Sequence, residues 1–211
     1  MVIVSSFELT YNNTSGFFTI TTKESLSCPF CRGELVYRDC KLRKLKDLLG
    51  RVRCFLLRRL RCQGNYCKKL HTELPDIIQP YKHYESSVIQ AVIDGSADAA
   101  DCHADNSTIR RWKTEFEKAE PDIAQRLASV YAQTTGEIAP IETTYKILDT
   151  IKTNCERWLA FVMVLLINSG HKICTQFAFC PPESPDTVGS RSKNDTKERG
   201  KKDDATIEDS S

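Results

Sequence analysis

Apolar and polar residues alternate with a period of two in the central basic stretch of the chain. The run 52–62 places four apolar residues on one face and puts arginines on the other. This pattern predicts a strand with a basic outer face, and Gly50 predicts a turn from a preceding segment at 35–49. The apolar set is Val52, Cys54, Leu56 and Leu60, and the arginines are Arg51, Arg53, Arg59 and Arg61.

From residue 84 onward the apolar residues recur every three or four positions, which predicts helices. The first ends at Gly95, and a short alanine-rich piece follows at 96–102. A second helix begins after the N-cap candidates at 105–107, and a third begins near Pro121, a favourable first-turn residue. The longest helix is expected at 143–167.

Two further segments are set apart by composition. The run 158–167 is apolar on all sides but too short to span a bilayer, so a buried helix is predicted there. Residues 181–211 contain almost no large apolar side chains, which predicts a disordered tail. Residues 1–27 contain short β-type runs and carry no motif with readable chemistry.

The sequence therefore predicts an α+β fold. A small β-rich zinc ribbon is expected at 28–73, after an N-terminal segment at 1–27. An all-α domain with a helix-turn-helix is expected at 81–170, before the tail at 181–211.

Ten cysteines occur in the 211 residues. The N-terminus has no basic stretch followed by an apolar block, so we expect no signal peptide and a cytoplasmic protein with reduced thiols. Paired cysteines in that setting favour metal binding. Cys28 and Cys31 form one close pair, and Cys62 and Cys67 form a second.

These two pairs predict a four-thiolate zinc site, because two tight turns can complete a tetrahedron around one ion. His71 is an alternative fourth ligand to Cys67. Cys40 and Cys54 could also contribute, and a set of free core thiols is the remaining reading. Cys102, Cys155, Cys174 and Cys180 are expected to be ordinary buried or tail cysteines.

The net charge of +2 hides a strongly basic block. Residues 28–71 hold 13 Lys and Arg against three acids, a net charge of +10. Such a block is typical of nucleic-acid binding, although a merely solvated basic face is the simpler reading. The expected phosphate contacts are Arg43, Lys44, Arg51, Arg53, Arg58, Arg59, Arg61, Lys68 and Lys69.

The segment 84–118 has the order of a helix-turn-helix, whose last helix enters the major groove. Ile109, Trp112 and Phe116 would pack against the preceding helices. An ordinary three-helix bundle is the alternative. The side chains expected to face DNA in the helix 107–118 are Ser107, Thr108, Arg110, Arg111 and Lys113.

Several stretches are also familiar together: the Cys-Pro-Phe-Cys pair, Arg-Asp-Cys-Lys-Leu-Arg at 38–43, and His-Thr-Glu-Leu-Pro-Asp at 71–76. With Pro-Tyr-Lys-His-Tyr-Glu at 80–85 and Ser-Thr-Ile-Arg-Arg-Trp at 107–112, the chain resembles a family of short bacterial proteins. These look like the zinc-binding and helix-turn-helix part of insertion-sequence transposases, without the catalytic domain. The resemblance covers about residues 26–170. It implies DNA binding, a mobile-element origin and the four cysteines as ligands.

We therefore expect a zinc-dependent protein that binds double-stranded DNA and is nucleoid-associated when bound. No catalysis is expected, because the helical part offers no strands to carry a metal-binding carboxylate set. An RNA-binding zinc ribbon and an adaptor for a recombinase are the alternatives. In the adaptor reading, residues 143–167 would mediate self-association or contact a recombinase or transposase. No membrane partner is expected.

Overall fold

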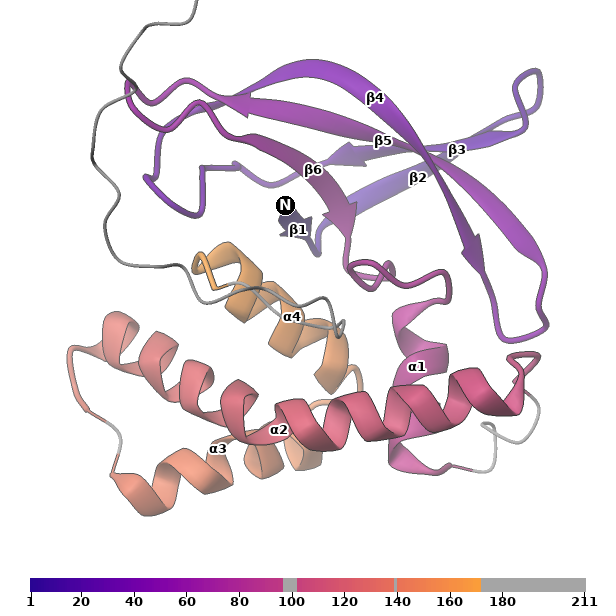
Figure 1. The fold of residues 1–211 in the computed structure, drawn as a ribbon. Helices are drawn as coiled ribbons and strands as arrows, with labels where there is room; N and C mark the ends of the chain where they lie inside the picture. Colours follow the sequence, from indigo (N-terminus) through magenta and orange to yellow (C-terminus); the bar gives the residue numbers. More distant parts are fainter. Residues whose placement is uncertain (97–101, 139, 172–211) are drawn as a thin grey trace, which may run out of the picture. The chain divides into compact units, whose positions relative to one another are not determined.

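Six strands come first in the chain and four helices follow (Figure 1). The computed structural model describes residues 1–96, 102–138 and 140–171. The strands are β1 (Val2–Val4), β2 (Phe7–Asn12), β3 (Phe17–Thr22), β4 (Leu35–Lys46), β5 (Val52–Cys62) and β6 (Leu70–Pro75). The helices are α1 (Ser86–Asp94), α2 (Asn106–Thr135), α3 (Ile141–Asn154) and α4 (Trp158–Asn168).

Strand β5 organises the sheet because it pairs along both edges. It is antiparallel to β4 from Cys62, opposite Leu35, to Val52, opposite Lys46. The other edge is shared, since β3 runs parallel beside Phe55 and β6 runs antiparallel beside residues 59–61. β2 then extends β3, and β1 extends β6. The result is a curled mixed sheet shaped like half of a barrel, with the helices on one side of it (Figure 1).

The faces predicted for β5 are wrong over residues 52–57, whereas Leu60, predicted on the apolar face, is buried and Arg61, predicted on the basic face, is exposed. Phe55 and Leu57 are 0% and 2% exposed and belong to the core, whereas Val52 is 55% exposed. Side chains alternate along a strand, so Arg53 and Arg59 lie on the same side as Phe55 and Leu57. Burial of these two large apolar side chains decides the phase, because it removes more apolar surface from water than burial of Val52 and Cys54 would.

Helix α2 is continuous where two helices were predicted. Pro121 does not begin a new helix but lies inside the span Asn106–Thr135, on the exposed side. The apolar stripe through Trp112, Ile123 and Leu127 continues across it and is buried along its length. The helix therefore tolerates the one backbone hydrogen bond that proline cannot donate.

The predicted helix-turn-helix at 84–118 does not form a bundle of its own. The apolar sides of α1 and α2 join one core with sheet residues such as Leu45 and Phe55 and with α4. The last helix of the motif also continues to Thr135. Most of the expected short middle helix, residues 97–101, lies outside the described residues.

The single helix predicted at 143–167 is two helices, broken at residues 155–157. Gln90 of α1 holds the break against α1: its amide donates to the carbonyl of Glu156, within the break, at 2.7 Å and accepts from the N–H of Leu159, in the first turn of α4, at 3.2 Å. The break lets the fully apolar α4 enter the core while α3 packs along α2. Burial of residues 158–167 is thus confirmed, apart from the half-exposed Phe161 and its partly exposed neighbours at 164 and 165.

The expected architecture of a small ribbon followed by an all-α domain is therefore wrong. Residues 1–27 supply three strands to the same sheet as the basic block, and sheet and helices share one core. Within the described ranges, no helix combines the length and apolarity that crossing a bilayer requires. The predicted tail at 181–211 lies outside the described residues.

The end of α4 is fastened to the short edge strand β1 by one side chain. Asn168 accepts from the Ile3 N–H at 2.9 Å and donates to the Ile3 carbonyl at 2.8 Å. The Asn168 side-chain amide thus pairs with the β1 backbone as a neighbouring strand would. Ile3 itself is 1% exposed. The N-terminal strand and the last helix are joined through this contact.

We predict that Asn168→Ala lowers the free energy of unfolding by about 1–3 kcal/mol, because it leaves two part-buried backbone groups without partners. Chemical denaturation followed by circular dichroism measures the change. Asn154→Ala, at an exposed position near the end of α3, is the matched control. An equal loss in both variants would contradict the role of Asn168.

Candidate functional site

The two cysteine pairs meet at the open end of the β4–β5 hairpin. Cys62 ends β5, opposite Leu35 at the start of β4, so the loops before β4 and after β5 lie side by side. Backbone hydrogen bonds fix these loops, from Cys28 N–H to the Gly33 carbonyl and from Cys62 N–H to the Lys69 carbonyl, both at 2.9 Å. The pairing register of β4 and β5 therefore brings the two cysteine pairs together, which the sequence spacing alone did not determine.

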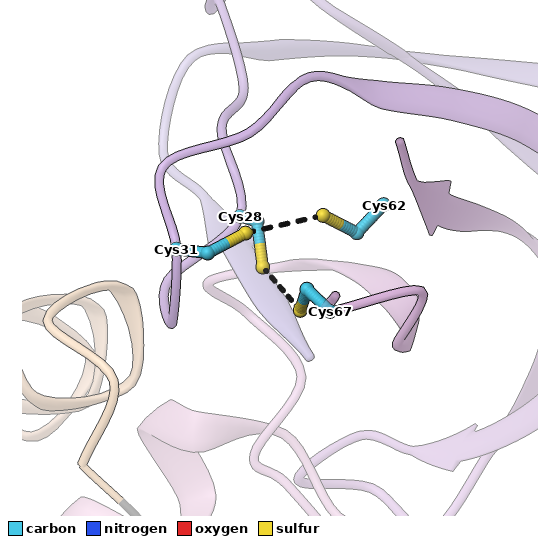
Figure 2. A group of neighbouring side chains, drawn as sticks. All are labelled: Cys28, Cys31, Cys62 and Cys67. Carbon is cyan, nitrogen blue, oxygen red and sulfur yellow. Dashed lines mark hydrogen bonds between the residues drawn. The ribbon is translucent and has the colours of Figure 1, made fainter. Parts of the chain in front are cut away.

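The four thiols Cys28, Cys31, Cys62 and Cys67 have their sulphur atoms within 4.8 Å of one another. Figure 2 shows them converging, with Cys31 and Cys62 Sγ atoms 3.3 Å apart and Cys28 and Cys67 Sγ atoms 3.6 Å apart. A tetrahedral ion with metal–sulphur bonds of about 2.3 Å needs sulphur separations of about 3.8 Å. The cluster could thus hold one metal ion after small adjustments.

Two glycines allow the loops to approach this closely. A Cβ atom on Gly64 would lie 2.9 Å from the Cys31 sulphur, and one on Gly33 would lie 3.3 Å from the same atom. A side chain at either position would push Cys31 away from the cluster. The loop 62–67 has four residues between its cysteines, yet both of its sulphur atoms reach the cluster. This is possible because Gly64 has no side chain to collide with the Cys31 sulphur.

The thiols differ in their readiness to ionise. Burial opposes ionisation of Cys28, but backbone N–H groups of Cys31 and Phe30 lower its pKa to about 7. Burial raises the pKa of Cys62 to about 12. The backbone of Lys69 favours the Cys67 thiolate, yet burial and the neighbouring thiols leave its pKa raised. A metal that binds here must displace protons from Cys62 and Cys67.

His71 lies beside the cluster and is 1% exposed. Its Nε2 atom is 3.4 Å from the Cys28 sulphur. Burial lowers the pKa of His71, so the ring is neutral at pH 7 and can donate from Nε2 to the thiolate. If the four thiols hold a metal ion, His71 is placed to orient Cys28 as a ligand.

The other described cysteines are separate from the cluster. Cys40 and Cys54 sit mid-strand on the face of the β4–β5 ladder that carries Leu56 and Arg58, and neither belongs to the four-sulphur group. Cys102 is buried and Cys155 lies at the break between α3 and α4. Cys174 and Cys180 fall outside the described residues.

Many of the expected phosphate contacts are neutralised by carboxylates. Arg58 donates two hydrogen bonds, of 2.8 and 2.9 Å, to Glu73, a carboxylate that is 2% exposed. Arg59 binds Asp39 in the same two-bond manner. Such bidentate pairs hold the guanidinium in place and cancel its charge. The remaining pairs are Arg51 with Asp47 and Arg53 with Glu85.

Arg43 also has an internal role. One of its guanidinium nitrogens donates to the Lys82 carbonyl at 2.5 Å, and its buried Nε atom has no hydrogen-bond partner among the described residues. Burial lowers the pKa of Arg43. This residue holds the segment 81–84 against β4.

A cleft of about 480 Å³ lies where the far end of the β4–β5 hairpin meets the start of α2. One wall is fixed by hydrogen bonds of Lys46 N–H to the His83 carbonyl, at 2.7 Å, and of Glu85 N–H to the Lys46 carbonyl, at 3.0 Å. Four cationic side chains and one carboxylate, Asp105, line it. The lining residues are Lys44, Lys46, Val52, Tyr81, Lys82, His83, Tyr84, Asp105, Thr108, Arg111 and Trp112.

The cleft brings together residues that were predicted in two separate modules. Lys44 comes from β4, while Thr108 and Arg111 come from the first turns of α2. Lys82 is paired with Glu115, and Arg111 lies 3.8 Å from the same carboxylate. In the described part of the chain, Lys44 and Lys46 have no carboxylate partner.

The start of α2 differs from the predicted recognition helix. Asp105 caps the helix, accepting from the Thr108 N–H at 2.9 Å and from the hydroxyls of Ser107 and Thr108. The Ser107 hydroxyl and the other two bonds lower the pKa of Asp105 to about 2. Ser107 and Thr108 are thus engaged within the protein, whereas Arg110 and Lys113 are exposed.

The last three expected contacts, Arg61, Lys68 and Lys69, are exposed around the cysteine cluster rather than at the cleft. The aromatic residues Tyr66 and Tyr81, which are 101% and 56% exposed, were not predicted as site residues. Tyr66 lies between Cys62 and Cys67, two cysteines of the cluster, and that placement could have indicated it. No sequence pattern near Tyr81 marks it as a site residue, because the cleft that it lines is formed by segments that meet only in the folded chain.

Comparison with known proteins gives one match. Residues 28–112 match the model of a family described as a domain of unknown function, DUF6431. The matched segment begins at the first cluster cysteine and includes all four cluster cysteines as well as the cleft residues of β4 and α2. No curated protein and no solved structure matches the chain. The resemblance to transposases stays a prediction.

We predict that the purified reduced protein binds about one metal ion through the four thiols. Cys31→Ser should lower the metal content measured by elemental analysis, because the thiolate at the centre is lost. Cys40→Ser, an exposed cysteine outside the cluster, is the matched control and should retain the metal. Metal loss in both variants, or in neither, would contradict the cluster.

We predict a smaller effect for His71. His71→Leu should keep the metal stoichiometry but weaken metal affinity by about 10- to 100-fold, as for other residues that orient a ligand. Competition with a chromogenic chelator measures the affinity. Complete loss of metal in His71→Leu, with metal retained in Cys67→Ser, would instead make His71 the fourth ligand.

Proposed function

We propose that the protein is a zinc-dependent, non-catalytic DNA-binding protein. The observation that carries the proposal is that one cleft is lined both by Lys44 and Lys46 of β4 and by Arg111 of α2. Zinc would hold the opposite end of the β4–β5 hairpin, and the cleft would bind the phosphate backbone.

Zinc is the metal that best suits the cluster. Soft thiolates favour zinc, copper(I) and iron–sulphur clusters, and four thiolates in tetrahedral arrangement are typical of structural zinc. Four protein ligands leave no position open for water or substrate. The centre therefore supports a stabilising role and gives no support to catalysis by the metal.

The cleft supports phosphate binding by charge and by placement. Lys44 and Lys46 alternate with the inward residues of β4, so they extend on the same side of the strand, one residue apart. Arg110 and Lys113 extend the positive surface along α2 next to Arg111. Lysine and arginine contacts with phosphates supply most of the sequence-independent affinity for DNA.

The N-terminus of α2 itself would not bind a phosphate. Its free N–H groups favour anions, but Asp105 already supplies a negative charge there. We propose that the exposed face with Arg110, Arg111 and Lys113 lies against the duplex, with the arginines suited to guanine edges in the major groove.

We predict that affinity for duplex DNA falls steeply with salt, with a log–log slope of about −0.9 for each phosphate contacted. The double variant Lys44→Gln/Lys46→Gln should reduce the slope by about 2 and weaken binding to all sequences. Fluorescence anisotropy with a labelled duplex at several salt concentrations measures both effects.

Lys146→Gln is the matched control, because Lys146 is exposed on α3 and away from the cleft. It should leave the slope unchanged. Binding that does not respond to salt would contradict the proposal, and so would an equal effect of the control. Stronger competition by structured RNA than by duplex DNA would make RNA the partner.

A further inference from the structure

Two aromatic and four cationic side chains surround the cysteine cluster. They come from the two loops that carry the cysteines and from the adjoining end of β5. All six are exposed. We call this surface the knuckle tip; it consists of Phe30, Arg32, Arg61, Tyr66, Lys68 and Lys69.

The cations of the knuckle tip differ from those further along β5. Among the described residues, none of the four has a carboxylate within ion-pair distance, whereas Arg53, Arg58 and Arg59 are all paired. Lys68 donates to the Gln63 carbonyl at 3.2 Å, and Arg32 to the Asn168 carbonyl at 3.3 Å. These neutral partners orient the side chains and leave their charges available.

The aromatic rings of the knuckle tip have free surface. Tyr66 is 101% exposed, so its ring packs against none of the described residues. Phe30 is 46% exposed, and the Lys69 ammonium lies 3.7 Å from its ring centre. Exposed rings next to unpaired cations are how proteins bind unpaired bases, since any base can stack on a ring while its phosphate meets a cation.

The backbone supports a role for two of the cations. Arg32 and Lys68 each follow the second cysteine of their loop, with positive φ values of 60° and 46°. Glycine adopts this conformation without strain, and other residues do not. A charged side chain at both equivalent positions therefore carries a local structural cost, and backbone strain of this kind clusters at functional sites.

We propose that the knuckle tip binds unpaired bases of a nucleic-acid strand, with Tyr66 as the stacking surface. The inference rests on the proposed function in that both require nucleic acid, but it concerns a different surface. The cleft lies at the other end of the hairpin, eleven residues or about 36 Å along β4. The protein would therefore prefer DNA in which a duplex adjoins a single strand.

The test compares a blunt duplex with the same duplex carrying a single-stranded extension, by fluorescence anisotropy on the zinc-loaded full chain. The wild-type protein should bind the extended probe more tightly. Tyr66→Leu should weaken binding of the extended probe by about 5- to 100-fold, the range found for loss of one stacked base. Its affinity for the blunt duplex should not change. Tyr131→Leu, at another exposed tyrosine, is the matched control.

Lys68→Gly separates a binding role from a structural one. It should raise or maintain the melting temperature, because glycine relieves the strained backbone, and yet weaken binding of the extended probe. If Lys68 only balances the charge of the metal–thiolate centre, the variant will lose metal affinity and keep DNA affinity, which overturns the proposal.

The remaining outcomes distinguish the two proposals. Tight binding of the blunt duplex with no gain from the extension would overturn the knuckle tip and leave the duplex cleft standing. Tyr66-dependent binding of the extended probe with no binding of the blunt duplex would overturn the duplex cleft and support the knuckle tip. Equal weakening of both probes by Tyr66→Leu also overturns the assignment of the knuckle tip to unpaired bases.

Discussion

The convergence of four sulphur atoms at the open end of the β4–β5 hairpin is the constraint that brings three separate segments of the sheet region together. It joins the loop before β4, the end of β5 and the loop before β6 at a place with little apolar core. The loop before β4 also contacts the segment that follows α4. A Cβ atom on Gly170 would lie 2.9 Å from the Pro29 carbonyl oxygen. A metal bound at the thiols would thus stabilise the sheet and the docking of the last helix together.

Pairing within the protein, rather than the number of charges, decides where the molecule can bind a polyanion. The basic block carries a net charge of +10, but its central arginines are held by Asp39, Glu73 and Glu85, of which only Asp39 lies within the block. Buried or half-buried ion pairs of this kind fix geometry more than they add stability. Unpaired cations remain at the two ends of the hairpin, in the cleft and at the knuckle tip.

The sequence was sufficient where chemistry and short spacing decide the outcome. Cys28, Cys31, Cys62 and Cys67 were predicted as one cluster from their spacing in two close pairs, with His71, Cys40 and Cys54 left open as alternative ligands, and the structure brings these four together. Gly50 was predicted as a turn, and it has a φ of 73° between β4 and β5. The buried state of residues 158–167 followed from their composition, since a helix without a polar side has to be enclosed.

Tertiary structure decided what depends on long-range partners. Alternation along β5 is compatible with either face inward, and only the tertiary core that includes Phe55 and Leu57 decided which side chains of its first half are buried. Pro121 predicts a helix start, yet the buried stripe of α2 outweighs one lost hydrogen bond. The cleft joins Lys44 to Arg111 across 67 positions of sequence, through strand pairings that no local pattern encodes. The residue types and spacing of each cysteine pair are encoded locally, whereas the meeting of the two pairs and the binding surface depend on strand pairing in the fold.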